Sequence, residues 1–328
     1  MSQSIDLTGQ VAIITGAAGA LGKAYALALA ARGAAVVVND LGGDTRGEGG
    51  GLGLAAAVAD EIRARGGQAI ANCDTVATRA GGEALTRAAV EAFGRVDIVI
   101  NNAGNQRNAL FEDLTEDDIE SVLAVHLKGA FFVTQPAYRL MKQQGYGRIV
   151  FTSSQSGVFG NPYRANYGAA KMGTVGLMRV LVQEAPAGIR INCVMPNASG
   201  SRMGAPGEAR VDKDFIAEIL SRGNKYAEAS APEYTAALVT WLASRECDVS
   251  GEVFSVLRGH YGRVFTGLVD GWAPALGQLP TPEDVAAHAA DIRRPQAWDE
   301  PQSGLSEGDI VRARLDRRYE GGGSPGNA

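Results

Sequence analysis

Short apolar runs recur along the chain, and longer stretches of helical character separate them. Because these runs are apolar on both faces, they predict buried strands, at Val11–Thr15, Ala35–Asn39, Gln68–Asn72, Val96–Ile100, Gly147–Thr152, Ile189–Val194 and Val253–Val256. Helices are predicted between them, at Leu21–Arg32, Ala55–Arg65, Arg79–Phe93, Asp117–Lys142, Asn166–Ala185 and Pro232–Ser244. The alternation predicts an α/β fold, a single Rossmann-type doubly wound parallel sheet with helices on both faces.

This pattern weakens from about Arg258, where prolines become frequent. One helix is predicted at Pro282–Ile292, since proline suits the first turn of a helix. The glycine-rich tail Glu320–Ala328 is predicted to be disordered. We therefore predict one domain over residues 1–257 and a C-terminal extension over residues 258–328.

The composition indicates a large folded domain and argues against several classes of partner. The 328 residues are 45% hydrophobic and 20% charged, which permits a sizeable core. A formal net charge of −5 argues against nucleic acid as a partner. The three cysteines, far apart in sequence, predict reduced thiols and a cytoplasmic location, and the isolated histidines predict no metal site. No apolar run is long enough to predict a signal peptide or a membrane span.

A glycine-rich turn, Thr15–Gly22, joins the first predicted strand to the first predicted helix. Glycines in such a turn let a ligand approach the backbone, and the free N–H groups of the helix N-terminus attract a pyrophosphate. A plain tight turn is the alternative reading. The position favours a dinucleotide site, with contacts from Gly16, Ala18, Gly19, Leu21 and Gly22.

Asp40 ends the second strand and suggests which dinucleotide binds. A carboxylate there can accept hydrogen bonds from the ribose hydroxyls, and it would repel a 2′-phosphate, so NAD is favoured over NADP. A loop-capping role is the alternative. Asp74 and Thr75 follow the third strand, where an adenine contact would fall, although Asp74 equally suits a turn or a helix cap.

Three small or polar residues end the fourth strand, where the crevice of a parallel sheet lies. We predict that they contact the cofactor, although such a sequence is often only a turn; they are Asn102, Ala103 and Gly104.

Tyr167 and Lys171 lie one helical turn apart, and Ser154 ends the fifth strand. Tyrosine is a weak acid with a pKa of about 10, and an adjacent ammonium would lower that pKa and permit proton exchange near neutrality. The ammonium would also bind the nicotinamide ribose, and the serine hydroxyl would hold the substrate oxygen. An ordinary surface pair is the alternative for Tyr167 and Lys171. Together with the glycine turn, the three residues predict hydride transfer between NAD and a secondary alcohol or ketone.

These motifs, in this order, resemble the short-chain dehydrogenase/reductase family over about residues 7–257. Agreement is best with the branch that holds the (3R)-hydroxyacyl-CoA dehydrogenase domains of peroxisomal multifunctional enzymes and bacterial 17β-hydroxysteroid dehydrogenase-like relatives. The matching stretches are Val38–Asp44, Val125–Gly129, Tyr146–Ile149, Ala165–Tyr167, Pro196–Asn197 and Ser201–Met203. The resemblance implies NAD, a cofactor contact at Pro196, a 3-hydroxyacyl-CoA substrate, and a homodimer or homotetramer built on the two long helices.

Other functions stay open beside this one. They are a 17β-hydroxysteroid dehydrogenase, an NADPH-linked 3-oxoacyl reductase, and a non-catalytic nucleotide-binding protein.

The chain departs from the family pattern at two positions. His126 stands where most of the family has an asparagine that holds a water in a proton relay from the lysine. An imidazole can donate or accept a hydrogen bond, so we interpret His126 as a catalytic residue; a buried structural histidine is the alternative. Asn197 follows Pro196 where glycine is usual, and asparagine tolerates unusual backbone angles.

The segment of about 197–226 falls where this family places its substrate lid. Its apolar residues suit an acyl chain or a sterol, or they pack an ordinary helix; they are Met203, Phe215, Ile216, Ile219 and Leu220. Its arginines, Arg202, Arg210 and Arg222, would meet phosphates of coenzyme A or face solvent.

Overall fold

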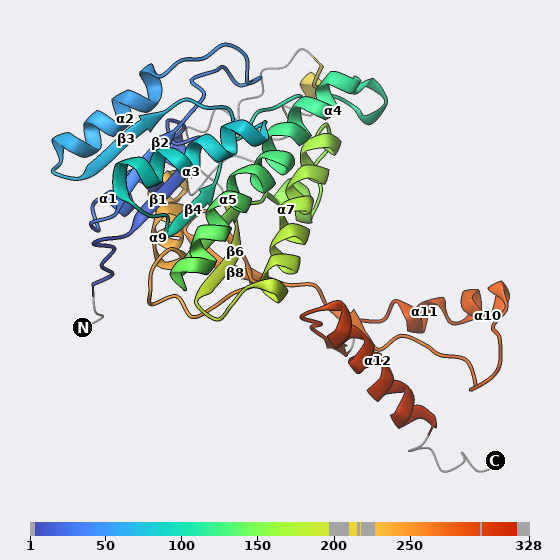
Figure 1. Ribbon diagram of the computed structural model, residues 1–328. Coiled ribbons are helices and arrows are strands. Elements are labelled where there is room, and N and C mark those ends of the chain that lie inside the picture. The colour runs from blue at the N-terminus through green and yellow to red at the C-terminus, as the bar shows by residue number, and fades with distance from the viewer. Residues whose placement is uncertain (1–3, 197–209, 215–216, 218–226, 296, 320–328) are drawn as a thin grey trace. The chain divides into compact units, whose positions relative to one another are not determined.

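The computed structural model describes residues 4–196, 210–214, 217, 227–295 and 297–319 (Figure 1). The chain divides into two units, Met1–Arg263 and Val264–Ala328. This division falls six residues beyond the predicted boundary at 257, because a strand that was not predicted extends the sheet. Most of the predicted lid, including Asn197, and the whole predicted disordered tail lie outside the described residues.

One eight-stranded sheet organises the first unit, in the order β3-β2-β1-β4-β5-β6-β7-β8. The strands are β1 (Val11–Thr15), β2 (Ala35–Asn39), β3 (Gln68–Asn72), β4 (Ile98–Asn101), β5 (Gly147–Thr152), β6 (Ile189–Pro196), β7 (Val253–Leu257) and β8 (His260–Val264). Neighbours from β3 through β7 pair in parallel. The strand order reverses between β1 and β4, and the crevice beyond their carboxyl ends is where such sheets bind ligands.

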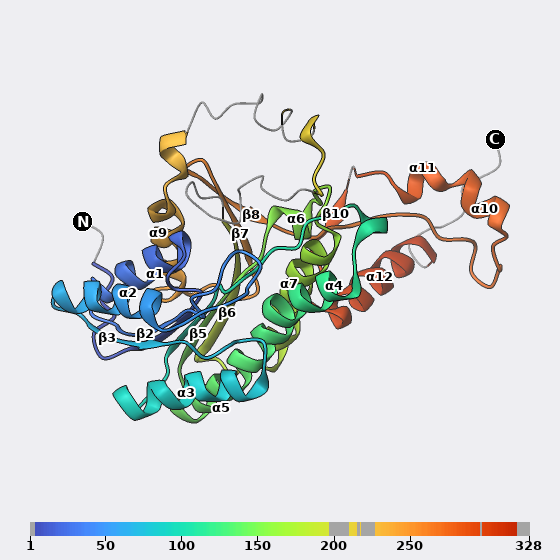
Figure 2. The ribbon, with the colours of Figure 1, turned by 90° about the horizontal axis from the view of Figure 1, so that it is seen from above.

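Helices cover both faces of this sheet, as Figure 2 shows, so the predicted doubly wound α/β fold is confirmed. One face carries α1 (Ala20–Ala30), α2 (Gly53–Ala64) and α9 (Pro232–Leu242). The other carries α3 (Arg79–Phe93), α5 (Gly129–Gln144) and α7 (Ala165–Glu184). Every residue of β1, β2 and β5 is buried, which explains why these strands are apolar on both faces.

The long helix predicted at Asp117–Lys142 is interrupted. A 3₁₀ turn at Phe111–Asp113 precedes α4 (Glu116–Leu123), which begins at a capping box formed by Thr115 and Asp118. One π-helical turn, Ala124–Lys128, then separates α4 from α5. Such turns are rare and occur frequently at functional sites.

Strands β7 and β8 are joined by Arg258 and Gly259 alone, which requires an antiparallel hairpin. Both residues have positive φ, 51° and 74°, as a type I′ turn demands. Two further elements of this unit were not predicted, namely the short helix α6 (Gln155–Val158) and a 3₁₀ turn at Ala227–Ser230.

The second unit contains three helices and a small antiparallel ribbon among its described residues. The helix predicted at Pro282–Ile292 is divided at His288 into α10 (Pro282–Ala287) and α11 (Ala289–Ile292). The ribbon pairs β9 (Leu268–Val269) with β10 (Trp298–Asp299), and Arg314 of α12 (Gly304–Tyr319) donates hydrogen bonds to both strands. No residue of α12 is buried, and two stacked ring pairs, Phe265 with Trp298 and Trp272 with His288, accompany the polar contacts of this unit.

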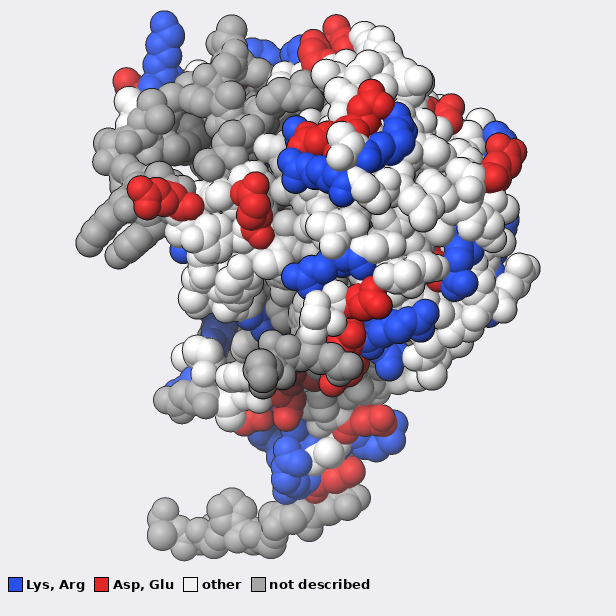
Figure 3. Space-filling view, turned by 90° about the vertical axis from the view of Figure 1, so that its left-hand side faces the viewer, with Lys and Arg blue, Asp and Glu red and all other residues white. Residues whose placement is uncertain are grey.

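Charges of both signs are interspersed on the face of the molecule shown in Figure 3, which carries no broad basic surface over its described atoms. The expectation that nucleic acid is not a partner therefore still rests on net charge and stays a prediction. Within the described residues, no helix is long and apolar enough to span a membrane.

Candidate active site

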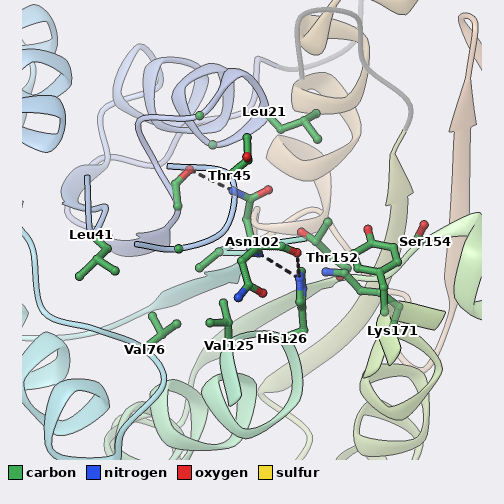
Figure 4. A pocket seen from close by; sticks show the side chains of 18 of the residues that line it. Leu21, Leu41, Thr45, Val76, Asn102, Val125, His126, Thr152, Ser154 and Lys171 are labelled. Carbon is green, nitrogen blue, oxygen red and sulfur yellow. Dashed lines mark hydrogen bonds between the residues drawn. The ribbon is translucent and has the colours of Figure 1, made fainter. Parts of the chain in front are cut away.

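A cleft of about 480 Å³ opens at the carboxyl ends of the parallel strands. Ser154 and Lys171 lie together at one end and Leu41 at the other, with His126 between them (Figure 4). Of the predicted site residues, all except Ala18 line this cleft, namely Gly16, Gly19, Leu21, Gly22, Asp40, Asp74, Thr75, Asn102, Ala103, Gly104, His126, Ser154, Tyr167, Lys171 and Pro196. The fold thus brings together residues spread over 180 positions of sequence.

The glycine turn packs tightly against the turn that follows β4. Gly16 has φ +64°, and a Cβ there would lie 2.8 Å from the Cα of Ala103. The Asn102 amide donates to the carbonyls of Thr15 and Gly16 at 3.0 and 3.2 Å. The Thr15 hydroxyl in turn accepts hydrogen bonds from the backbone N–H groups of Asn102 and Ala103, at 2.9 and 3.0 Å. These bonds give Thr15 and Asn102 a supporting role that the sequence motif did not reveal.

Ala18 serves the site indirectly, because its backbone N–H donates to the Asp40 carboxylate at 2.9 Å. The other oxygen of that carboxylate accepts from the Gly42 N–H at 2.8 Å. Asp40 is 8% exposed and lines the cleft, so two backbone donors fix its carboxylate at the wall. Asp74 is held in a similar way, since the Asn72 amide donates to its carboxylate at 2.7 Å.

Residues 41–51, which we call the strap, form a closed loop after β2. The Gly51 N–H donates to Leu41 O at 2.9 Å and closes the neck of the loop. The strap docks onto segment 105–107. The docking contacts are Gln106 N–H to Thr45 O at 2.9 Å, Asn105 Nδ2 to Arg46 O at 3.4 Å, and Arg107 Nη2 to Glu48 Oε1 at 3.1 Å.

Ser154, Tyr167 and Lys171 meet at the other end of the cleft. Ser154 caps α6, where its hydroxyl accepts a hydrogen bond from the Ser156 N–H at 3.2 Å, and it lines the cleft together with Tyr167. The Lys171 ammonium lies 5.6 Å from the centre of the Tyr167 ring and donates to Thr152 O at 2.5 Å. The predicted trio is therefore assembled by the fold.

The electrostatics of this trio differ from the sequence expectation. Burial raises the pKa of Tyr167, and the Ser154 hydroxyl and the Arg164 charge oppose that rise. Burial lowers the pKa of Lys171 to about 7, so the amine is only partly charged near neutrality. Lys171 was expected to lower the tyrosine pKa. Desolvation outweighs such an effect here, and the cation that acts on the Tyr167 pKa is Arg164.

His126 lies on the π turn, and its ring makes an edge contact with Tyr167 at 5.0 Å between centroids. Nε2 lies 2.9 Å from Asn105 O and 3.2 Å from Asn105 N, whereas Nδ1 is buried and has no hydrogen-bond partner among the described residues. Burial and the Lys171 charge hold the pKa of His126 well below its usual value, so the imidazole is neutral. A Cβ at Gly104 would lie 2.4 Å from the His126 ring, so glycine is required there to admit the imidazole.

Arg210, for which a phosphate contact or exposure to solvent was predicted, is paired with Asp118 and is 35% exposed. Its guanidinium donates to both carboxylate oxygens of Asp118 at 2.9 and 3.0 Å, and this pairing lowers the pKa of that carboxyl far below its usual value. The other lid residues that sequence reasoning named lie outside the described residues, namely Arg202, Met203, Phe215, Ile216, Ile219, Leu220 and Arg222. No cluster of three or more potential metal ligands occurs among the described residues.

Comparison with known proteins places this site in context. Residues 10–211 match the family described as short chain dehydrogenase. The chain is 41% identical over 321 residues to peroxisomal multifunctional enzyme type 2 of Mus musculus, covering 94% of this chain and 40% of that protein. It is 39% identical over 284 residues to peroxisomal hydratase-dehydrogenase-epimerase of Saccharomyces cerevisiae, covering 86% of this chain and 29% of that protein.

A solved structure shows the same fold. Full-length peroxisomal multifunctional enzyme type 2 from Drosophila melanogaster superposes with a TM-score of 0.76 at 29% identity, covering 97% of this chain and 52% of that one. The chain therefore spans about half or less of the length of these relatives.

Proposed function

The chain belongs to the short-chain dehydrogenase/reductase family, and from this premise we propose that it transfers a hydride between NAD and the CH–OH group of a 3-hydroxyacyl-CoA. One observation carries the proposal: Ser154, Tyr167 and Lys171 converge at one end of a cleft whose other end holds the fixed carboxylate of Asp40. The relatives' names support a hydroxyacyl substrate, since one of them is a hydratase-dehydrogenase-epimerase.

The residues of the cleft fit a nicotinamide dinucleotide. The glycine turn leaves no room for a Cβ at Gly16, so backbone forms the wall where a pyrophosphate would lie. Asp40 supports NAD over NADP, because a 2′-phosphate would meet its carboxylate. The cations that line the described cleft, Arg164 and Lys171, belong to the opposite end and would not neutralise that phosphate.

The protein's own groups would manage the proton. In oxidation, the Tyr167 phenolate takes the proton of the substrate hydroxyl, and the Ser154 hydroxyl holds the same oxygen. A nicotinamide cofactor held by the glycine turn and Asp40 would supply the acceptor for the hydride. Lys171, whose ammonium lies 5.6 Å from the centre of the Tyr167 ring and whose pKa is about 7, would contact the nicotinamide ribose.

His126 extends this proton path. Its neutral ring contacts Tyr167, and Nδ1 has no partner among the described residues. A neutral imidazole can accept a proton on one nitrogen while the other is held by Asn105. We therefore assign His126 the relay position that asparagine occupies in most of the family.

A homodimer or homotetramer is part of the proposal. The outer surfaces of α5 and α7 expose large apolar side chains, with Phe131 at 48%, Met172 at 44% and Val180 at 57%. Burying these side chains against a second copy would remove them from water.

Comparing substrates and cofactors tests the proposal. The purified protein, supplied with NAD⁺, is expected to form NADH from (3R)-hydroxyacyl-CoA esters faster than from 17β-hydroxysteroids, and to bind NADH at least tenfold more tightly than NADPH. A preference for NADPH would refute the cofactor assignment. Turnover of steroids alone would refute the substrate assignment.

A further inference from the structure

Helix α7, which carries Tyr167, begins without an ordinary cap. Arg164 is its N-cap, and the side chain of that residue makes no capping hydrogen bond. A cap side chain usually accepts a hydrogen bond from an N–H group two or three residues into the helix. Here the N–H group three residues in belongs to Tyr167, and it donates to Asn166 Oδ1 at 2.7 Å. The backbone of Tyr167 is therefore held by its own neighbour.

The side-chain amide nitrogen of Asn166 contacts two other segments of the fold. It donates to Arg107 O at 3.0 Å and to Asp118 O at 2.9 Å, so both of its hydrogens are used. Asn166 is 5% exposed, and a polar side chain buried to that degree costs free energy unless its atoms are paired. One buried side chain thus joins the backbone of Tyr167 to segment 105–107 and to α4.

Both of these segments are fixed by contacts of their own. Asp118 closes the capping box at the start of α4. In segment 105–107, Asn105 contacts Nε2 of His126, and the ring of that histidine lies 5.0 Å from the Tyr167 ring. The side chain that holds the tyrosine backbone is therefore attached to the segment that also holds the histidine beside the tyrosine ring.

Proton transfer is sensitive to the position of the tyrosine hydroxyl. The hydroxyl must lie within hydrogen-bond reach of the substrate oxygen, at about 2.6–3.2 Å. A displacement of about 1 Å can lower the rate roughly 10²-fold. Because a side chain moves with its backbone, a small shift in the first turn of α7 would displace the hydroxyl of Tyr167.

Resting on the proposed function, we infer that Asn166 is a positioning residue for proton transfer. It fixes the first turn of α7 against segment 105–107 and α4, and so sets the place of the Tyr167 hydroxyl. Asn166 is not among the described residues that line the cleft, so it acts through Tyr167 rather than on a ligand. Its loss should lower kcat and change cofactor affinity little, because the glycine turn and Asp40 hold the cofactor.

Steady-state kinetics of Asn166→Ala test this inference, with Asn192→Ala as the matched control. Asn192 is also buried, donates its amide to Val249 O at 3.0 Å and accepts from the Glu252 N–H at 3.1 Å, and it is not among the described residues of the cleft lining. We expect Asn166→Ala to lose roughly 10- to 10²-fold in kcat, with KM and NADH affinity within about threefold of the parent. Asn192→Ala should lower the free energy of unfolding, because it too leaves buried groups unpaired, and should keep the parent's kcat.

A crystal structure of Asn166→Ala gives a readout that does not depend on turnover. The Tyr167 hydroxyl is expected to be displaced by about 1 Å relative to His126. If Asn166→Ala does not fold, Asn166→Ser, whose hydroxyl can still donate to one carbonyl, is measured in the same way.

A kcat equal to the parent's, an equal loss of kcat in Asn192→Ala, or an undisplaced Tyr167 hydroxyl would overturn the inference. Failure of the parent to oxidise (3R)-hydroxyacyl-CoA esters, with the hydroxyl displaced in the variant, would count against the proposed function alone.

Discussion

Burial governs the protonation of the two groups at the centre of the site. It raises the pKa of Tyr167 and lowers that of Lys171 to about 7. Each shift opposes the charged form, because the cleft wall removes water from both side chains. The Ser154 hydroxyl and the Arg164 charge oppose the tyrosine shift. The fold therefore bears a free-energy cost to hold a lysine where catalysis needs one.

Replacing Lys171 with methionine should expose that cost. The folded pKa, about 7, lies below the unfolded value of about 10.4, so between these pH values the unfolded chain binds more protons and stability rises with pH. At pH 7 we expect Lys171→Met to be about 1–2 kcal/mol more stable than the parent and inactive. This difference in the free energy of unfolding should disappear as pH approaches 10. Urea unfolding across this range measures it.

Lys128→Met serves as the control, since Lys128 pairs with Glu120 in an exposed salt bridge at 2.7 Å. Surface pairs contribute little, so this variant should show no such pH-dependent gap. The lowered pKa of Lys171 would be contradicted if Lys171→Met and the parent had equal free energies of unfolding at pH 7. It would also be contradicted if the difference between them increased with pH.

At the scale of elements, the strap links the cofactor end of the cleft to the catalytic end. It docks on segment 105–107, where Asn105 contacts His126 and the Arg107 carbonyl accepts a hydrogen bond from Asn166, the neighbour of Tyr167. A salt bridge between Glu48 and Arg107 joins the strap to that segment, the Arg107 charge also acts on Asp44 of the strap, and the Arg107 side chain is almost fully buried. Release of a bound cofactor should require the strap to loosen.

Removing the Glu48 carboxylate should therefore speed cofactor release. We expect Glu48→Ala to raise the dissociation rate of NADH about fivefold, since an ion pair of this kind contributes about 1 kcal/mol. Stopped-flow fluorescence measures the rate. Asp60→Ala, which removes a similarly exposed and paired carboxylate on α2, should leave it unchanged. Equal rates in all three proteins would show that the strap does not retain the cofactor.

The sequence predicts the regular elements well and the irregular ones poorly. Strands such as Val11–Thr15 were predicted because burial on both faces leaves an apolar run. The π turn was not, because Asp117–Lys142 has a continuous helical pattern and the distortion accompanies packing of His126 against Gly104. Strand β8 was missed because its residues are mostly polar and half-exposed.

In the site, too, local features were predicted from the sequence and contacts between distant residues were not. Motif residues such as Tyr167 and Lys171 were predicted from spacing along one helix, which is a local property. The docking of the strap depends on contacts between residues about sixty positions apart, which no local pattern reveals. Arg164, whose charge acts on the Tyr167 pKa, carried one available signal, a basic residue three positions before the tyrosine.

At the scale of the whole molecule, the chain combines a dehydrogenase unit with a second unit of little buried core. The proposed oligomer would bury the apolar faces of α5 and α7. We expect Val180→Glu to convert the oligomer to monomers, because a buried carboxylate without a partner is costly. Sedimentation velocity measures the mass. Val90→Glu, at an exposed apolar position on α3, is the matched control and should leave the mass unchanged.

The central claim is that the Tyr167 hydroxyl exchanges the proton of the reacting alcohol, and Tyr167→Phe tests it most directly. The measurement is the rate of NADH formation from a (3R)-hydroxyacyl-CoA and NAD⁺, set beside the affinity for NADH. We predict a loss in kcat of roughly 10²- to 10⁴-fold, with NADH affinity within about threefold of the parent. A variant that keeps the parent's kcat would contradict the mechanism.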